Sequence, residues 1–218
     1  MIKSFSNKKE KDIKKSNSKE GNNQTDSKEK RLLTTAFNLF TEKGIKNTSI
    51  QEIVDNADVG KGTFYLYFKD KYEIRDILIV KKTKKLFQDA LKELRKENYE
   101  TLTEQVLFVI DYVINELEKN TILLKFISTN LSWGIYNKTV NKLYEQNESE
   151  DEENSILKLF LKNVKEKNIK IDNPEVTLYM IIQLTSSTCF NSILYKDPLP
   201  INEFKPILFN TIKTLINE

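Results

Sequence analysis

The sequence predicts an all-α protein of about nine to ten helices, in which a three-helix helix-turn-helix domain precedes a larger helical bundle. Three observations predict this class. Only five glycines and four prolines interrupt the 218 residues, and they separate long segments instead of marking frequent turns. Apolar residues recur with the helical period from Ser27 onward. Residues that cap helices stand at the starts of several of these segments. We place the part boundaries at 1–26, 27–86 and 87–218.

The first 26 residues are rich in Lys, Asn and Ser and carry a net charge of +3. Such a composition cannot bury enough apolar surface to order itself, so we expect a disordered basic tail. The alternative is an arm that adds non-specific attraction to phosphates.

Two short helices follow the tail. In the first, Leu33, Ala36, Phe37 and Phe40 share one face, and Gly44 is the expected C-cap. We expect Thr48 and Gln51 to form the capping box of the second helix. Its apolar stripe is Ile50, Ile53, Val54 and Ala57.

The third helix, expected over 61–68, follows a tight connection at 58–60. Phe64 and Phe68 stand at i and i+4 and are expected to pack inward. The opposite sides then present a lysine, a threonine and two tyrosines beside the side-chain-free Gly62. This set suits a nucleic-acid groove, because hydroxyls and lysine contact phosphates or bases and glycine permits close approach. The alternative is that the tyrosines only cover the core. The exposed set is Lys61, Thr63, Tyr65 and Tyr67.

A long fourth helix is expected over 71–96. Asp70 is its predicted N-cap, and Glu73 occupies the capping-box position. Lys71 lies in the first turn, where a lysine is mildly unfavourable but well placed for a phosphate.

The remaining helices are expected at about 101–119, 121–135, 137–146, 154–168, 174–195 and 203–217. Asn173 and Pro174 are a cap residue and a first-turn proline for the fifth of these. The acidic run of Glu148 and residues 150–153 is expected to be a solvated loop.

Composition excludes several kinds of site. The chain has no histidine and one cysteine, Cys189, so zinc sites, Ser-His and Cys-His nucleophile systems and an internal disulfide are not expected. We therefore expect no enzyme, metal or cofactor, although a carboxylate-based enzyme in the second part stays open. Cys189 is expected to be a small buried residue. No apolar run approaches the roughly 20 residues of a membrane span, and one cysteine suits a reducing cytoplasm.

Charge is unevenly distributed along the chain. Residues 1–100 have a net charge of +7 and residues 101–218 a net charge of −4. This asymmetry indicates a polyanion partner for the first half only.

About sixty residues resemble the N-terminal domain of TetR-family repressors. The matching motifs are 38–44, 48–53 and 60–71, which include the run Gly62-Thr63-Phe64-Tyr65-Leu66-Tyr67-Phe68. Gly60 departs from the pattern, since many members have a serine there as N-cap; glycine is a slightly weaker cap. The resemblance implies phosphate contacts by Thr48 and Ser49, base reading or close approach at Lys61, Gly62 and Thr63, and backbone anchoring by Tyr65, Tyr67 and Lys71.

The resemblance also implies a function for each part. Residues 27–86 would bind double-stranded DNA, and residues 87–218 would bind a small-molecule effector and dimerise. The protein would be a cytoplasmic, nucleoid-associated regulator that represses transcription from a palindromic operator as a homodimer and is released by its effector. A helical protein-interaction adaptor without specific DNA binding is the alternative.

Helices 154–168 and 174–195 have wide apolar arcs. We expect them to build a two-fold dimer interface, a four-helix bundle, although a single buried hairpin would explain the same pattern. Aromatic and small polar residues predict an effector pocket, although an aromatic stripe is also typical of plain core. The candidates are Phe87, Phe108, Tyr112, Phe126, Trp133, Tyr136, Ser187 and Asn191.

Overall fold

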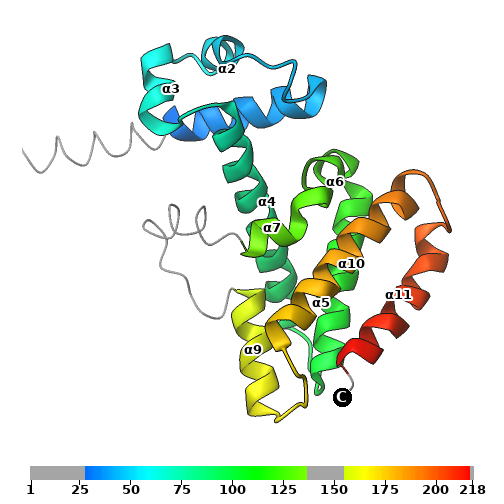
Figure 1. The fold of residues 1–218 in the computed structure, drawn as a ribbon. Coiled ribbons are helices and arrows are strands. Elements are labelled where there is room, and N and C mark those ends of the chain that lie inside the picture. Colours follow the sequence, from blue (N-terminus) through cyan, green and yellow to red (C-terminus); the bar gives the residue numbers. More distant parts are fainter. Residues whose placement is uncertain (1–27, 137–154, 217–218) are drawn as a thin grey trace, which may run out of the picture. The chain divides into compact units, whose positions relative to one another are not determined.

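The computed structural model describes residues 28–136 and 155–216. Every element in these ranges is helical, which confirms the all-α prediction (Figure 1). The predicted tail, the predicted helix 137–146 and the acidic run lie outside the described residues. The chain divides into two compact units between Arg75 and Asp76, here called the N-terminal and C-terminal units. This division and the predicted boundary after residue 86 both fall within one long helix, α4 (Lys71–Leu94).

The N-terminal unit contains a first helix described over 28–43, then α2 (Ile50–Asn56), α3 (Lys61–Tyr67) and the start of α4. Most of the predicted inward residues form its core, although Phe37 and Ile50 are only half-buried. Phe64 and Phe68 are buried with their ring centroids 5.7 Å apart. They share the interior with Leu32, Ala36, Phe40, Ile53 and Val54.

Two predicted caps of this unit are confirmed. Gly44 has a φ of +82°, and its N–H donates to the Phe40 carbonyl over 3.1 Å. Glycine suits this position because a side chain would strain the left-handed backbone. The carboxylate of Asp70 accepts from the N–H groups of Tyr72 and Glu73 over 2.8 and 2.9 Å, so Asp70 caps α4.

The predicted capping box of α2 is wrong by one residue. The N-cap is Ser49, whose hydroxyl accepts from the Glu52 N–H over 3.1 Å, while the Glu52 carboxylate accepts from the Ser49 N–H over 2.9 Å. Both Thr48 and Ser49 can cap a helix. Ser49 is the cap because the Thr48 hydroxyl is buried and donates to the Gly44 carbonyl instead.

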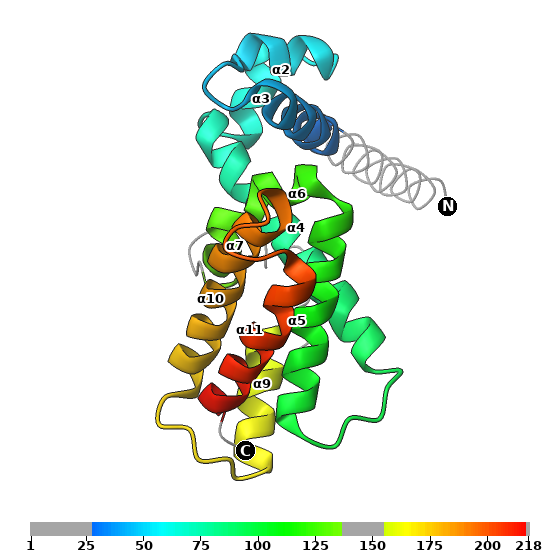
Figure 2. The same ribbon diagram turned by 90° about the vertical axis from the view of Figure 1, so that its right-hand side faces the viewer.

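The C-terminal unit contains the rest of α4 and seven further described elements. α10, α11 and α5 run alongside one another in both views (Figures 1 and 2). The elements are α5 (Leu102–Lys119), α6 (Thr121–Ile127), the 3-10 helix η1 (Ser128–Asn130), α7 (Leu131–Tyr136), α9 (Ile156–Glu166), α10 (Pro174–Leu194) and α11 (Ile201–Ile216).

One predicted helix of this unit is interrupted. The segment expected to be continuous over 121–135 is α6, η1 and α7 in turn. The break falls at Ser-Thr-Asn, three residues of low helix propensity. None of the described helices is both long enough and apolar enough to cross a membrane.

Candidate nucleic-acid interface

The orientation of α3 follows from its two phenylalanines. Because Phe64 and Phe68 are buried, the side of the helix opposite them faces away from the core of the N-terminal unit. Lys61, Gly62 and Tyr65 are exposed. Tyr65 retains 54% of its surface, and its ring contacts Phe64 edge-on, with 5.4 Å between centroids.

Thr63 and Tyr67 are half-buried, in contrast to Lys61 and Tyr65. The Tyr67 ring lies 6.1 Å from that of Phe68. Tyr67 therefore covers part of the core, as the alternative interpretation expected, while the rest of its side chain still meets solvent.

The backbone at the start of α3 is open. Gly60 is the N-cap and supplies no side-chain bond; its carbonyl accepts from the Thr63 and Phe64 N–H groups over 2.8 and 3.4 Å. A Cβ added at Gly62 would meet no described atom within 4 Å. Gly62 is thus not required by packing within the described chain, and its bare surface can approach a ligand closely.

The start of α2 presents the second predicted contact, Ser49, which is exposed. Its neighbour Glu52 forms an ion pair with Lys43 and accepts from both the N–H and the hydroxyl of Ser49. These bonds lower the pKa of Glu52 from 4.5 to about 2, with the Lys43 hydrogen bond as the largest cause. The carboxylate therefore stays ionised at the positive end of the α2 dipole.

Thr48 occupies a different environment from Ser49. Only 1% of its surface is exposed, and its hydroxyl donates to the carbonyls of Gly44 and Leu39 over 2.9 and 3.4 Å. This hydroxyl is not on the surface. It ties the loop before α2 to the first helix.

Lys71 also bonds within the chain. Its Nζ donates to the carbonyls of Thr48 and Lys46 over 2.8 and 3.2 Å, and it lies 5.6 Å from the ring centroid of Tyr72. The start of α4 is thereby joined to the loop that leads into α2. Sequence reasoning could not find this bond, because the partners are 23 and 25 residues apart.

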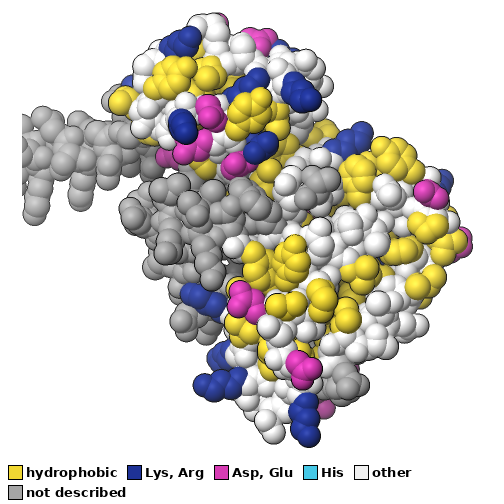
Figure 3. All heavy atoms as spheres, viewed as in Figure 1, with side chains coloured by type: hydrophobic (Ala, Val, Ile, Leu, Met, Phe, Trp, Pro, Cys, Tyr) yellow, Lys and Arg dark blue, Asp and Glu magenta, His cyan; other side chains and the backbone are white. Residues whose placement is uncertain are grey.

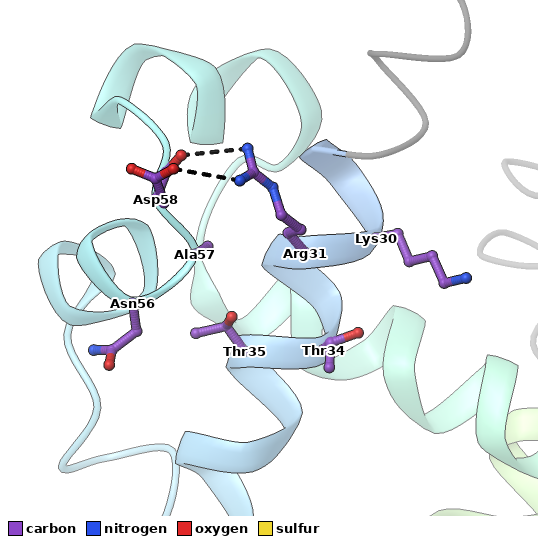
Figure 4. Close-up of a pocket in the computed structure, with 7 residues that line it drawn as sticks. All are labelled: Lys30, Arg31, Thr34, Thr35, Asn56, Ala57 and Asp58. Atoms are coloured by element: carbon purple, nitrogen blue, oxygen red, sulfur yellow. Dashed lines mark hydrogen bonds and ion pairs between the residues drawn. The ribbon is translucent and has the colours of Figure 1, made fainter.

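A hollow of about 410 Å³ lies on the N-terminal unit between the first helix and the turn that joins α2 to α3 (Figure 4). Arg31 points across it to Asp58, forming an ion pair of 3.5 Å and a bond to the Asp58 carbonyl of 3.3 Å. Its other lining residues are Lys30, Thr34, Thr35, Asn56 and Ala57. The exposed residues of α3 do not line this hollow.

The predicted effector-pocket residues fall into different environments. Phe87 is part of the core of the C-terminal unit, and four other predicted aromatic residues are half-buried against this core. Ser187 and Asn191, in contrast, are exposed on α10. The side chain of Trp133 lies outside the described part. The four half-buried residues are Phe108, Tyr112, Phe126 and Tyr136.

The structure pairs two of these aromatics with residues that were not predicted. Phe108 contacts Tyr99, with 5.4 Å between centroids. Tyr136 contacts the ring of Tyr179 at 5.5 Å, and its hydroxyl donates to the Glu175 carbonyl over 3.2 Å. Burial raises the pKa of Tyr136 well above its ordinary value. The Tyr136 phenol is therefore a neutral donor.

Buried hydroxyls are the polar groups of this core that sequence reasoning missed. Within the described residues, the hydroxyls of Thr83 and Ser128 are buried without a hydrogen-bond partner, while Ser132 donates to the side-chain carbonyl of Gln183. Thr83 lies on the apolar face of α4, one turn before Phe87. This position could have predicted a buried hydroxyl from the sequence, because a threonine on an apolar stripe is buried with its neighbours.

No group of three or more carboxylate, histidine or cysteine side chains that could hold a metal occurs within 28–136 and 155–216. Cys189 of α10 is buried in the core of the C-terminal unit, and this burial raises the pKa of its thiol to about 12. Cys189 is thus a buried residue, as predicted.

Residues 32–76 match the family described as "Bacterial regulatory proteins, tetR family". Among curated relatives, the chain is 48% identical over 44 residues to YuxN of Bacillus subtilis, described as an uncharacterized HTH-type transcriptional regulator; this covers 20% of the chain and 15% of YuxN. It is 31% identical over 106 residues to YvdT of the same organism, covering 46% of the chain and 52% of YvdT. The matched part spans about half or less of these relatives.

Solved structures share the fold over most of the chain. A TetR-family transcriptional regulator from Syntrophomonas wolfei has a TM-score of 0.60 at 22% identity, covering 88% of this chain and 95% of that one. The fatty acid degradation regulator FadR from Bacillus halodurans has a TM-score of 0.57 at 18% identity, covering 85% and 94%. At these identities the likeness shows the fold alone.

Proposed function

We propose that this chain, whose residues 32–76 match the tetR family of bacterial regulatory proteins, is a TetR-family transcriptional regulator whose α3 reads the major groove of DNA. One observation carries the proposal. Phe64 and Phe68 anchor one side of α3 in the core, while Lys61, Gly62 and Tyr65 are exposed to solvent. A short helix of this kind fits the width of the major groove.

The proposed contacts divide into two kinds. The residues that contact the DNA directly are Ser49, Lys61, Gly62, Thr63, Tyr65 and Tyr67. Thr48 and Lys71 act indirectly: their bonds to Gly44, Leu39, Lys46 and the Thr48 carbonyl hold the loop that places Ser49. The net charge of +7 in residues 1–100 adds non-specific attraction.

The protein acts as a homodimer on a palindromic operator, with the two α3 helices about 34–36 Å apart in successive grooves. Three exposed residues of α10, Val176, Tyr179 and Met180, and Ile207 of α11 support an interface between α10 and α11 of two subunits. Figure 3 shows hydrophobic side chains distributed over the face of the C-terminal unit on which these helices lie.

α9 is a weaker candidate for this interface than the sequence indicated. The apolar residues of α9, among them Ile156, Phe160 and Leu161, are buried or half-buried against the core of their own chain. Its exposed residues are charged, among them Lys158, Lys162, Lys165 and Glu166. The wide apolar arc of α9 is therefore satisfied within one subunit, and we assign the interface to α10 with α11.

A small-molecule effector is proposed to bind in the C-terminal unit and to release the operator. The buried hydroxyls of Thr83 and Ser128, which no described group bonds, and the half-buried aromatics support a site there. A coupling of about 1–3 kcal/mol between the two sites is enough for a regulatory response. The protein represses its genes in the cytoplasm until the effector arrives. A thermal-shift screen of cationic and lipid-like compounds would identify candidate effectors.

The test is DNA binding by the full chain. Duplexes enriched from a random library by the wild-type protein are titrated by fluorescence anisotropy at several salt concentrations. We expect a steep salt dependence, with weaker binding by Tyr65→Ala and unchanged binding by Tyr195→Ala, an exposed tyrosine of the C-terminal unit. An absence of enriched sequences, with little salt dependence, would favour a protein-interaction adaptor.

The dimer has a separate test. Met180→Lys places a charge within the proposed interface and should shift the sedimentation of the protein from dimer to monomer. A wild-type protein that sediments as a monomer at micromolar concentration, with DNA binding intact, would rule the dimer out.

A further inference from the structure

Leu66 is the most exposed large apolar residue described in the chain. It retains 82% of its surface, against 54% for its neighbour Tyr65. Leu66 lies in α3, a helix of seven residues that is otherwise rich in polar side chains. Solvation of this leucine contributes nothing to folding, and no described segment covers it.

Helical geometry places Leu66 directly opposite the core. At roughly 100° per residue, the midpoint between Phe64 and Phe68 lies roughly 180° around the helix from Leu66. Thr63 and Tyr67 lie together on one flank of the helix, and both are half-buried. The outermost line of α3 is therefore Leu66 and, one turn earlier, Gly62.

Gly62 gives this line its shape. A Cβ at Gly62 would meet no described atom within 4 Å, so the backbone there is bare. A DNA groove can approach the helix closely at Gly62, which brings the protruding Leu66 against the base edges one turn further on. The only apolar group on the major-groove edge of a base pair is the 5-methyl of thymine.

We propose that Leu66 is a base-specificity residue that packs against the 5-methyl group of a thymine in the operator. The inference rests on the proposed DNA binding. It adds a methyl-reading position to the hydrogen-bonding positions around it. Tyr65 lies to one side of the outermost line and is left to contact the DNA backbone.

The test removes only the methyl group. In the duplex enriched by the wild-type protein, each thymine is replaced in turn by deoxyuridine, and the affinity is measured by anisotropy. Replacement of the contacted thymine should weaken wild-type binding about fourfold per half-site, the factor that burial of one methyl group contributes. Leu66→Ala should bind the thymine duplex more weakly and should lose no further affinity with deoxyuridine at that position.

Two controls accompany this variant. Leu66→Met keeps an apolar side chain of similar volume and should retain the deoxyuridine effect. Ile122→Ala removes another exposed apolar residue, on α6, and should behave as the wild type. Thermal unfolding of Leu66→Ala should match the wild type because the side chain is exposed.

Two results would overturn the inference while leaving DNA binding in place. One is a deoxyuridine effect of the same size in Leu66→Ala and wild type at every thymine; the other is a wild-type protein insensitive to every replacement. If no sequence is enriched by the wild-type protein, the proposed function fails, and the inference fails with it.

Discussion

Replacement of Lys71 by methionine tests whether this lysine positions the loop before α2 or contacts a DNA phosphate directly. The side chain keeps a similar length but has no ammonium group to donate to the Thr48 and Lys46 carbonyls. A hydrogen bond to a charged group contributes about 1.5–3 kcal/mol when shielded from water. Since the Lys46 bond is exposed and the Thr48 bond is part-buried, we expect the local stability of the loop and α2 to fall by about 1–2 kcal/mol.

The local stability is measured by hydrogen exchange of the α2 amides. A decrease of about 1–2 kcal/mol corresponds to exchange roughly 5–30 times faster. The same variant is titrated with DNA at several salt concentrations. We expect weaker binding, because Ser49 is less well placed, with an unchanged salt dependence, because the number of neutralised phosphates stays the same.

Lys61→Met is the matched comparison. Lys61 is exposed on α3, so its replacement should leave exchange in α2 unchanged and reduce the salt slope by about 0.9 for each phosphate that is no longer neutralised. Lys125→Met, on exposed α6 surface, should change neither quantity. Should Lys71→Met reduce the salt slope and leave exchange in α2 unchanged, Lys71 would bind a phosphate directly and the positioning role would be refuted.

Three further predictions concern stability and reactivity. The depressed pKa of Glu52 stabilises the fold fully above about pH 4.5, and this stabilisation is lost as the pH falls toward 2; Glu52→Gln should flatten that part of a thermal-unfolding profile, and an unchanged profile would contradict the assignment. Gly134→Ala would place its Cβ 2.7 Å from the Thr83 hydroxyl, so it should lower the free energy of unfolding by about 1–3 kcal/mol. Addition of Thr83→Ala should relieve this destabilisation. A stabilised Gly134→Ala variant would show instead that α4 and α7 separate easily. Cys189 should react with a thiol reagent at pH 8 only after unfolding, because burial raises its pKa to about 12; rapid reaction of the folded protein would show that the thiol is accessible.

Local features of the sequence determined the helices of the N-terminal unit and their orientation. The i, i+4 spacing of Phe64 and Phe68 predicted which side of α3 is buried, and burial of both confirms it. Gly44 and Asp70 were recognised as caps because capping depends on residues within one turn of a helix end. The periodic spacing and the family motif both predict a three-helix helix-turn-helix for this unit.

Interactions between distant segments decided what local patterns could not. Thr48 and Ser49 are equivalent as caps, and only the bonds of Thr48 to Gly44 and Leu39 assign the cap to Ser49. The first-turn position of Lys71 and the family motif predicted a phosphate contact, whereas its bonds to the Lys46 and Thr48 carbonyls, more than twenty residues away, could not be predicted locally. A periodic pattern shows which side of a helix is apolar, but not which segment covers it.

The same limit applies to the two surfaces on which the proposed function depends. Sequence patterns could not separate α9 from α10, since both have wide apolar arcs; packing showed that α9 satisfies its arc within the chain and that Val176 and Met180 of α10 stay exposed. Leu66 was an inconspicuous apolar residue between two tyrosines until the buried phenylalanines placed it on the outermost line of α3. Residue types and their spacing determined that this protein carries a helix suited to reading DNA, and tertiary packing decided which of its side chains lie on the exposed side of that helix.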